Sequence, residues 1–480
     1  MSVPVYRPKI QVTLLKQVQR RGSSQNAEPQ SNGDTVDLTP FFGDASGIRT
    51  TKSLHQPAGS FVLSFADQAH PRTLDTIAAM VEPMDAIEIR GAREPHRHIG
   101  QPLPLLMRGW VSDIFRNEEM SDDGPRRTVT IHGQDAGRLW LIHQALFEVA
   151  LLQEVPFLEQ FRMQVATGLT VYALPVSEFI RQLTERVMNE KVRALAAFQR
   201  DQFRPFRVDA TVKQGTVSVT TSSNIQGPIW KIASTFIDRP WNEFFVEDEE
   251  EGPLVRFRPA PYRNLEGRFI MPDATDPGTI ELKDDSVALL SGHRSDWQVA
   301  NFFSVLSPSG MVDTGGMVNV AQLQRGEPLD FQHPNNRPEL YGVRRMEATT
   351  ALLPDGMRPP SSEATGTAVA QSALSVVDWC VQRRTELKLA NRDNALFESV
   401  KMTARGSEEL KIGRYLRLDR GGFRSEAYVT QVAHDIRPLR GWTTALTMDR
   451  GTSFIERRRA AAPRSPYLNE SGRGPYSQES

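Results

Sequence analysis

The chain carries one order of strand-like segments twice, and this repeat limits its fold more than any other feature. Residues 84–137 contain "AIEIRGARE", "RGWVSDIFRNE" and "RRTVTIHGQDAG" in succession. Residues 413–451 contain "YLRLDRGGF", "EAYVTQVAHDI" and "GWTTALTMDRG" in the same order. Alternating apolar and polar residues, with many β-branched and aromatic ones, are typical of strands. The repeat predicts two related small β-domains. Chance similarity between short amphipathic strands is the competing explanation.

Period-two alternation predicts which side chains of these segments point inward. A further strand precedes each set, "SFVLSFAD" before the first and "FESVKMTARG" before the second. Gly421 and Gly422 supply the positive φ of a tight hairpin turn. Trp110 and Trp442 are expected to be buried at matching positions of the two copies. The predicted core residues of the repeated units are Ile87, Ile89, Trp110, Val129, Ile131, Leu416, Leu418, Trp442 and Leu446.

The pattern between the two repeats changes to helical spacing. An apolar stripe that includes Phe179, Leu183 and Val187 predicts a helix, and Gly227-Pro228 is suited to the start of another. "FFVEDEEEGPLVRFRP" predicts a hairpin with residues 249–252 at its turn. The predicted fold class is therefore α+β and β-dominated, with two similar small β-barrel-like domains, a largely helical insertion and mobile ends.

Composition sets the outer limits on function. The 480 residues have a formal net charge of −1, so long-range attraction to nucleic acid or anionic membranes is not indicated. The single cysteine, Cys380, excludes an intrachain disulfide framework, fits a reducing cytosol and is expected in a helix core. The N-terminus lacks an apolar signal region, and Glu148 and Glu154 interrupt the most apolar stretch. We therefore expect neither a signal peptide nor a membrane span.

Motifs that would indicate catalysis or metal binding are not found. The sequence has no Gly-Lys dipeptide, which excludes a P-loop, and neither G-x-S-x-G nor H-E-x-x-H. His96 and His98 have a spacing that a metal could use, but they lack an obvious third ligand. The acidic run Glu247–Glu251 lacks the spaced ligands of a calcium loop, so a solvated turn is expected. We predict no catalytic residue, no cofactor and no metal.

The ordered set of segments resembles the central baseplate hub proteins of contractile phage tails and the hubs of related phage-like particles. The first half contributes "GSFVLSFAD", "MDAIEIRG", "RGWVSDIF" and "RTVTIHGQDAG" to this resemblance. The middle contributes "PWNEFFVEDEEEGPLVRFRPAPY" and "HRSDWQVANFFSVLSP". The end contributes "LYGVRRMEATT" and the final meander, "KIGRYLRLDRGGFRSEAYVTQVAHDIRPLRGWTTALTMDRG". Departures are the long polar N-terminal insertion, the Pro-rich stretch around 354–360 and the basic C-terminal tail.

The resemblance implies a structural homotrimer in which two tube-like β-domains per subunit form a ring of six. Such a ring joins a sixfold tail tube to a threefold spike and encloses a channel. The implied partners are the chain itself, the tail tube or tube-initiator protein, the spike, the tape-measure protein and surrounding baseplate proteins. DNA would pass only transiently, so Arg417, Arg420 and Arg424 are expected to face protein neighbours or outer solvent. The implied location is the virion baseplate, after assembly in the bacterial cytoplasm.

The resemblance also divides the chain into domains. Residues 1–138 would form the first tube-like β-domain, with a polar insertion near 20–50, and residues 139–244 a mainly helical domain. Residues 245–456 would form the second tube-like β-domain, with loop and helix excursions near 311–390. The polar tail 457–480 is expected to be disordered, because it cannot bury enough apolar surface to offset ordering entropy.

Two other functions remain open from the sequence. A hub or distal tail protein of a non-contractile tail would share the β-domains, and a neighbouring sheath gene would separate it from the contractile case. A hub with cell-wall hydrolase activity would need carboxylates of shifted pKa in a cleft, and the sequence singles out none.

Overall fold

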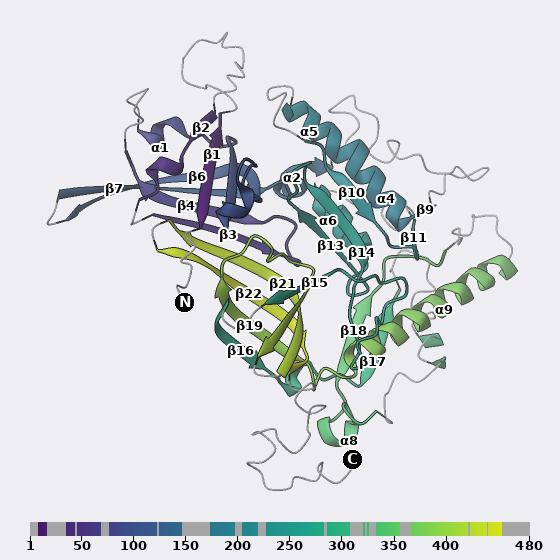
Figure 1. Ribbon diagram of the computed structural model, residues 1–480. Coiled ribbons are helices and arrows are strands. Elements are labelled where there is room, and N and C mark those ends of the chain that lie inside the picture. The colour runs from purple at the N-terminus through teal and green to yellow at the C-terminus, as the bar shows by residue number, and fades with distance from the viewer. Residues whose placement is uncertain are drawn as a thin grey trace, which may run out of the picture.

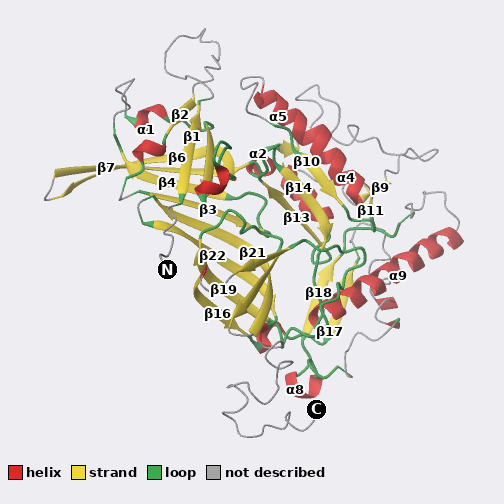
Figure 2. Cartoon of the chain, viewed as in Figure 1, coloured by secondary structure: helices red, strands yellow, loops and turns green. Residues whose placement is uncertain are grey.

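The computed structural model is dominated by strands, most of them in one large, mainly antiparallel sheet, with the longer helices on one side (Figures 1 and 2). It describes residues 8–16, 35–43, 46–68, 76–121, 124–145, 173–196, 204–218, 227–282, 286–307, 320–321, 324–325, 333–355, 366–420, 423–438 and 440–453. No helix in these ranges is both long and apolar enough to cross a membrane.

The first β-unit is the N-terminal half of the large sheet, with strand order β3-β4-β7-β6-β5-β1-β2. Alternation buries one face of its strands, as in β4, where Phe61, Leu63 and Phe65 are buried. The strands are β1 (Lys9–Leu15), β2 (Thr35–Asp37), β3 (Gly47–Ser53), β4 (Ser60–Ala66), β5 (Ala86–Ala92), β6 (Leu105–Ser121) and β7 (Gly124–Asp135). Short helical turns η1 (Thr39–Phe41), α1 (Ile77–Met80) and η2 (Pro95–His98) connect them.

The second β-unit repeats this topology. Its strands are β15 (Thr279–Leu282), β16 (Val287–His293), β19 (Glu398–Arg405), β20 (Tyr415–Arg420), β21 (Phe423–Arg437) and β22 (Gly441–Gly451). Their order, β16-β19-β22-β21-β20-β15, matches β3-β4-β7-β6-β5-β1 strand for strand, in space and along the chain. The β6–β7 pair shifts register between Val111 and Asp113, and β21–β22 shifts at the corresponding place, between Val429 and Gln431. One difference is that β1 is antiparallel to β5 whereas β15 is parallel to β20.

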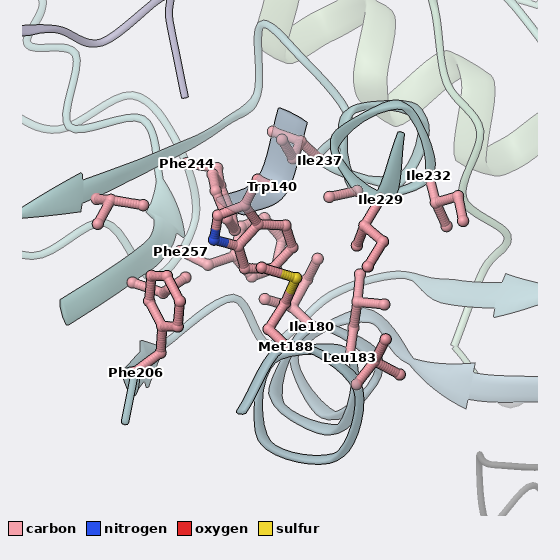
Figure 3. Close-up of a cluster of buried hydrophobic side chains, with 14 of the residues drawn as sticks. Trp140, Ile180, Leu183, Met188, Phe206, Ile229, Ile232, Ile237, Phe244 and Phe257 are labelled. Atoms are coloured by element: carbon pink, nitrogen blue, oxygen red, sulfur yellow. The ribbon is translucent and has the colours of Figure 1, made fainter. Parts of the chain in front are cut away.

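A central module lies between the two β-units in sequence and packs helices on a small sheet, β10-β14-β13. Trp140 lies at its centre, edge-to-face with Phe244 at a ring distance of 5.2 Å, among the apolar side chains of Figure 3. Its helices are α2 (Arg138–Ile142), α4 (Val176–Gln182), the π-helical η4 (Leu183–Met188), α5 (Asn189–Ala196) and α6 (Ile229–Phe236). Its strands are β8 (Gln144–Ala145), β9 (Ala173–Pro175), β10 (Arg207–Ala210), β11 (Thr216–Ser218), β12 (Gly227–Pro228), β13 (Asn242–Glu247) and β14 (Leu254–Pro259).

An outer module is inserted into the second β-unit between β16 and β19. It comprises η7 (Asp296–Gln298), the parallel pair β17 (Phe302–Leu306) and β18 (Arg345–Thr349), and helices α8 (Pro338–Tyr341) and α9 (Gly366–Asn391). Cys380 of α9 is fully buried in its apolar core, as expected, and burial raises the pKa of the thiol to about 12.

Two features of the predicted domain division differ from the structure. The boundary at 244/245 cuts β13, which pairs with β14 in the central module and not in the second β-unit, so the region before it is not simply helical. Residues 35–50 of the predicted polar insertion contain β2 and the start of β3. Local alternation identifies a strand but not its partner, which explains these errors. Residues 17–34 and 457–480, predicted as insertion and disordered tail, lie outside the described residues.

Candidate assembly interface

The two β-units are joined edge to edge within the one chain. β21 pairs antiparallel with β3 from Gln431 opposite Ser53 to Ile436 opposite Ile48. The other half of the same edge of β21 pairs with β20. The pairing satisfies backbone groups that would otherwise form two exposed strand edges. A continuous sheet therefore runs through both units (Figure 1).

Trp442 of β22 packs across this joint. Its side chain is 6% exposed and belongs to the apolar core of the first β-unit, although its strand belongs to the second. A Cβ added to Gly406 would lie 2.0 Å from the Trp442 Cγ, so the indole rests directly on that glycine. The same ring lies 3.5 Å from the Cβ position of Gly91 in the first unit. The tryptophan thus couples the two cores.

His434 supports Trp442 from the neighbouring strand. The indole Nε1 donates to His434 Nδ1 at 3.2 Å, and the Thr444 hydroxyl lies 2.8 Å from the same nitrogen. Burial lowers the pKa of His434 to about 4, so the ring is neutral near pH 7. A neutral imidazole with its proton on Nε2 can accept the indole N–H at Nδ1.

A buried ion cluster ties the joint to the central module. Lys52 of β3 lies 3.0 Å from the Asp135 carboxylate of β7 and 2.7 Å from Asp248, and all three side chains are largely buried. Burial raises the pKa of the Asp135 carboxyl to about 6 in spite of the Lys52 charge. Burial alone would lower the pKa of the Lys52 ammonium, but the two carboxylates outweigh it and raise that pKa.

The acidic run at the β13–β14 turn is solvent-exposed at Glu250 and Glu251, as predicted, and it is also paired with cations from both β-units. Glu250 forms a two-pronged contact with Arg90 of the first unit, at 2.7 and 2.8 Å. Glu247 lies 3.3 Å from Lys411, which belongs to the second unit. Burial would raise the pKa of Glu247, but Lys411 and Arg256 outweigh it and lower the pKa to about 2. The turn therefore acts as an ionic bridge between the units.

The predicted core residues are all buried, but they do not form one site. Ile87, Ile89, Val129 and Ile131 lie in the core of the first β-unit, and Leu416 and Leu446 in that of the second. Leu418 is also buried. Gly421 and Gly422 lie outside the described residues, between Arg420 and Phe423, which face one another across β20 and β21.

The two tryptophans do not occupy matching positions, contrary to the prediction. Trp110 lies on β6, whose counterpart by strand order is β21, whereas Trp442 lies on β22. The common bulge makes Tyr428 the counterpart of Trp110. Trp110 packs toward the central module and Trp442 toward the first unit. The prediction matched the two residues because both are tryptophans in strand segments, and residue type alone does not identify the equivalent strand.

Among the described residues, no three His, Cys, Asp or Glu side chains are grouped as a metal site requires. His98 instead lies 3.7 Å from Glu408, again between the two β-units. Arg417 contacts Glu281 and Glu426 at 3.2 and 2.9 Å, and Arg424 contacts Asp419 at 3.3 Å. These two arginines carry compensated charge, whereas the side chain of Arg420 lies outside what the structure describes.

The joining strand β3 is the part of this interface that sequence reasoning missed. Its sequence, "GIRTTKS", contains one large apolar residue, Ile48, and it lies next to polar segments. The sequence signal for this strand is the alternation of inward and outward residues, because Ile48 and Thr50 are buried on one face.

No protein-family model matches the sequence, and no curated protein matches it with significance. Solved structures align with it at low identity. A tail protein from Neisseria meningitidis MC58 is 10% identical with a TM-score of 0.47, over 94% of this chain and 99% of that one. The 43 kDa tail protein of prophage MuSo2 from Shewanella oneidensis is 11% identical with a TM-score of 0.41, over 92% and 98%. A prophage tail protein from Listeria monocytogenes EGD-e is 9% identical with a TM-score of 0.42, over 91% and 94%. At these values the likenesses carry no argument of their own.

Proposed function

We propose that this protein is a structural hub of a phage tail baseplate. Three copies form a ring that joins a sixfold tail tube to a threefold spike and encloses the path of the tape-measure protein and DNA. The observation that carries the proposal is the repeated β-unit, joined edge to edge by β21 and β3 within one chain. The ordered sequence resemblance to tail hubs supports the same function.

The repeat explains how one chain can serve two symmetries. Two units of the same strand order in each of three chains give six similar units around one axis, which suits a sixfold partner. The central and outer modules occur once per chain and keep the particle threefold. Ring closure also prevents open-ended growth from sheet edges.

The charge pattern supports a passive channel. DNA held by uncompensated Lys or Arg gains affinity at each phosphate contact, which would hinder its passage. Arg417 and Arg424 of the final meander are paired with carboxylates, so they offer little free positive charge. We propose no catalytic role. Incubation with the assembled protein is expected to leave peptidoglycan intact. Lysis of the peptidoglycan would show that the protein has a hydrolytic function as well.

The oligomeric mass tests the proposal. Native mass spectrometry of the full chain should give three times the 53.9 kDa chain mass, alone or after addition of its proposed spike partner. A monomer that persists with the spike present would overturn the proposal. A matched control is the chain with Leu340→Ala, a 70% exposed residue of α8 outside both β-units, which should keep the trimeric mass.

A further inference from the structure

We propose that the distal half of β6 pairs antiparallel with β16 of a second copy, with Asn117 opposite Ser291. The proposal rests on the ring proposed above and specifies its contact between copies. The occupant of each edge is the other edge of the same chain. The contact would repeat, between copies, the β21–β3 pairing that the structure contains within one chain.

Both strands have an open edge in the described part of the chain. β6 pairs with β7 over residues 109–121, but on its other side the backbones of the described residues bond only to residues 105–111, from β5 and the two residues just before it. In the second unit, the counterpart of the open half of β6 is residues 431–436 of β21, which β3 occupies. β16 is the counterpart of β3, and among the described strands it pairs only with β19. In Figure 1 the β6–β7 hairpin projects from one side of the molecule, and β16 forms the margin of the second unit.

The register follows from the matching rows of the two units. One cross-strand row runs through Ile48, Leu63, Ile131 and Ile114. The corresponding row runs through Leu290, Met402, Leu446 and Val432.

These rows make β16 the equivalent of β3 and Ile114 the equivalent of Val432. Within the chain, Val432 lies opposite Lys52, four residues after Ile48. Between copies, Ile114 would therefore lie opposite Arg294, which is four residues after Leu290. The same register places Asn117 opposite Ser291.

The side chains on the two edges suit this pairing. Phe115 is 49% exposed on β6, and Leu289 and Leu290 are 63% and 37% exposed on β16. Pairing would cover these apolar groups, and such exposed edges are otherwise prone to non-specific association. In the proposed register Phe115 faces His293, Arg116 faces Gly292 and Glu118 faces Leu290. Like charges are never opposite one another over residues 115–119, as a stable antiparallel pair requires.

The geometry is head-to-tail, because each copy offers one β6 edge and one β16 edge. A contact of this kind forms a ring when its rotation closes. Alternating β21–β3 joints within chains and β6–β16 joints between chains would give every β-unit the same pair of neighbours. The proposed trimer is the closed form with six units.

Disulfide trapping tests the register. The full-length chain with Asn117→Cys and Ser291→Cys is oxidised mildly and run on a denaturing, non-reducing gel. Directly opposite residues have the Cα separation that a disulfide needs, roughly 4.4–6.8 Å. The control carries Asp113→Cys and Ser291→Cys, also at exposed positions, with the two cysteines offset by four residues, about 13 Å along the strand. Cys380 stays in place because it is fully buried.

We expect covalent dimers and trimers from the test pair and at least tenfold less from the control. Mixing the two single-cysteine variants should give covalent dimers only, and neither variant alone should cross-link. A trimeric native mass with no cross-linking above the control would overturn the β6–β16 contact and leave the hub proposal standing. A monomeric mass would overturn both.

Discussion

Ile436 of β21 lies directly opposite Ile48 of β3, and both side chains are buried in the core of the first β-unit. One residue comes from near the start of the chain and the other from near its end. Their contact closes the sheet between two units that share one topology. The joint is therefore part of the folded core of the subunit.

Ile436→Ala should destabilise the subunit strongly. Truncation of a fully buried isoleucine removes apolar contacts and leaves a cavity, which typically costs about 2–5 kcal/mol. Denaturant unfolding monitored by tryptophan fluorescence measures this loss. Ile99→Ala is the matched control because Ile99 is 82% exposed, and it should change stability by less than about 0.5 kcal/mol. Equal effects of the two substitutions would show that the joint contributes nothing.

Trp442→Ala should cost about 3–5 kcal/mol and lower the Tm. Gly406→Ala should also destabilise, because the added Cβ would lie 2.0 Å from the indole. The two changes should be less than additive in a double-mutant cycle, since removing the indole relieves the clash. Calorimetry of the two single variants and the double variant gives the coupling. Trp297→Ala, at an 88% exposed tryptophan, should leave the Tm nearly unchanged, and a similar loss there would refute the account of Trp442.

Stability should fall as the pH drops from 6.5 toward 4, in part because of His434. Burial lowers the folded-state pKa of this residue to about 4. As the pH falls, the unfolded chain therefore binds the proton first, and the free energy of unfolding decreases. Asp135 acts in the opposite direction, since burial raises its pKa to about 6 in the folded state. The comparison of wild type with His434→Gln isolates the histidine. The variant should lose stability less steeply over this pH range, and an unchanged slope would contradict the assignment.

Lys52→Met should be among the most damaging single changes at a charged residue. It leaves the Asp135 and Asp248 carboxylates buried without their shared cation, and breaking a buried ion pair in this way costs about 3–5 kcal/mol. Adding Asp135→Asn should restore part of the loss. Arg424→Ala breaks an exposed pair with Asp419 and should cost less than about 1 kcal/mol. Comparable urea midpoints for Lys52→Met and Arg424→Ala would argue against the buried cluster.

The strands of the repeat could be predicted because alternation is a local signal. Residues such as Ile89 and Val129 are buried where the pattern placed them. Pairing partners are not encoded locally, so the sequence pattern places β13 in the wrong sheet and gives no prediction for β3. The ion cluster of Lys52, Asp135 and Asp248 joins three distant segments and has no sequence signature. The interface consists mainly of such long-range pairings, and for this reason the sequence predicted its strands but not its contacts.

Cryo-electron microscopy of the assembled particle, viewed down its axis, tests the central claim most directly. The account predicts three chains and a closed inner ring of six similar β-units, in which joints within and between chains alternate. The two units of each chain should be related by about a sixth of a turn, as six equal positions require. A particle with any other number of chains, or a ring in which β-units of different chains do not meet edge to edge, would contradict the account.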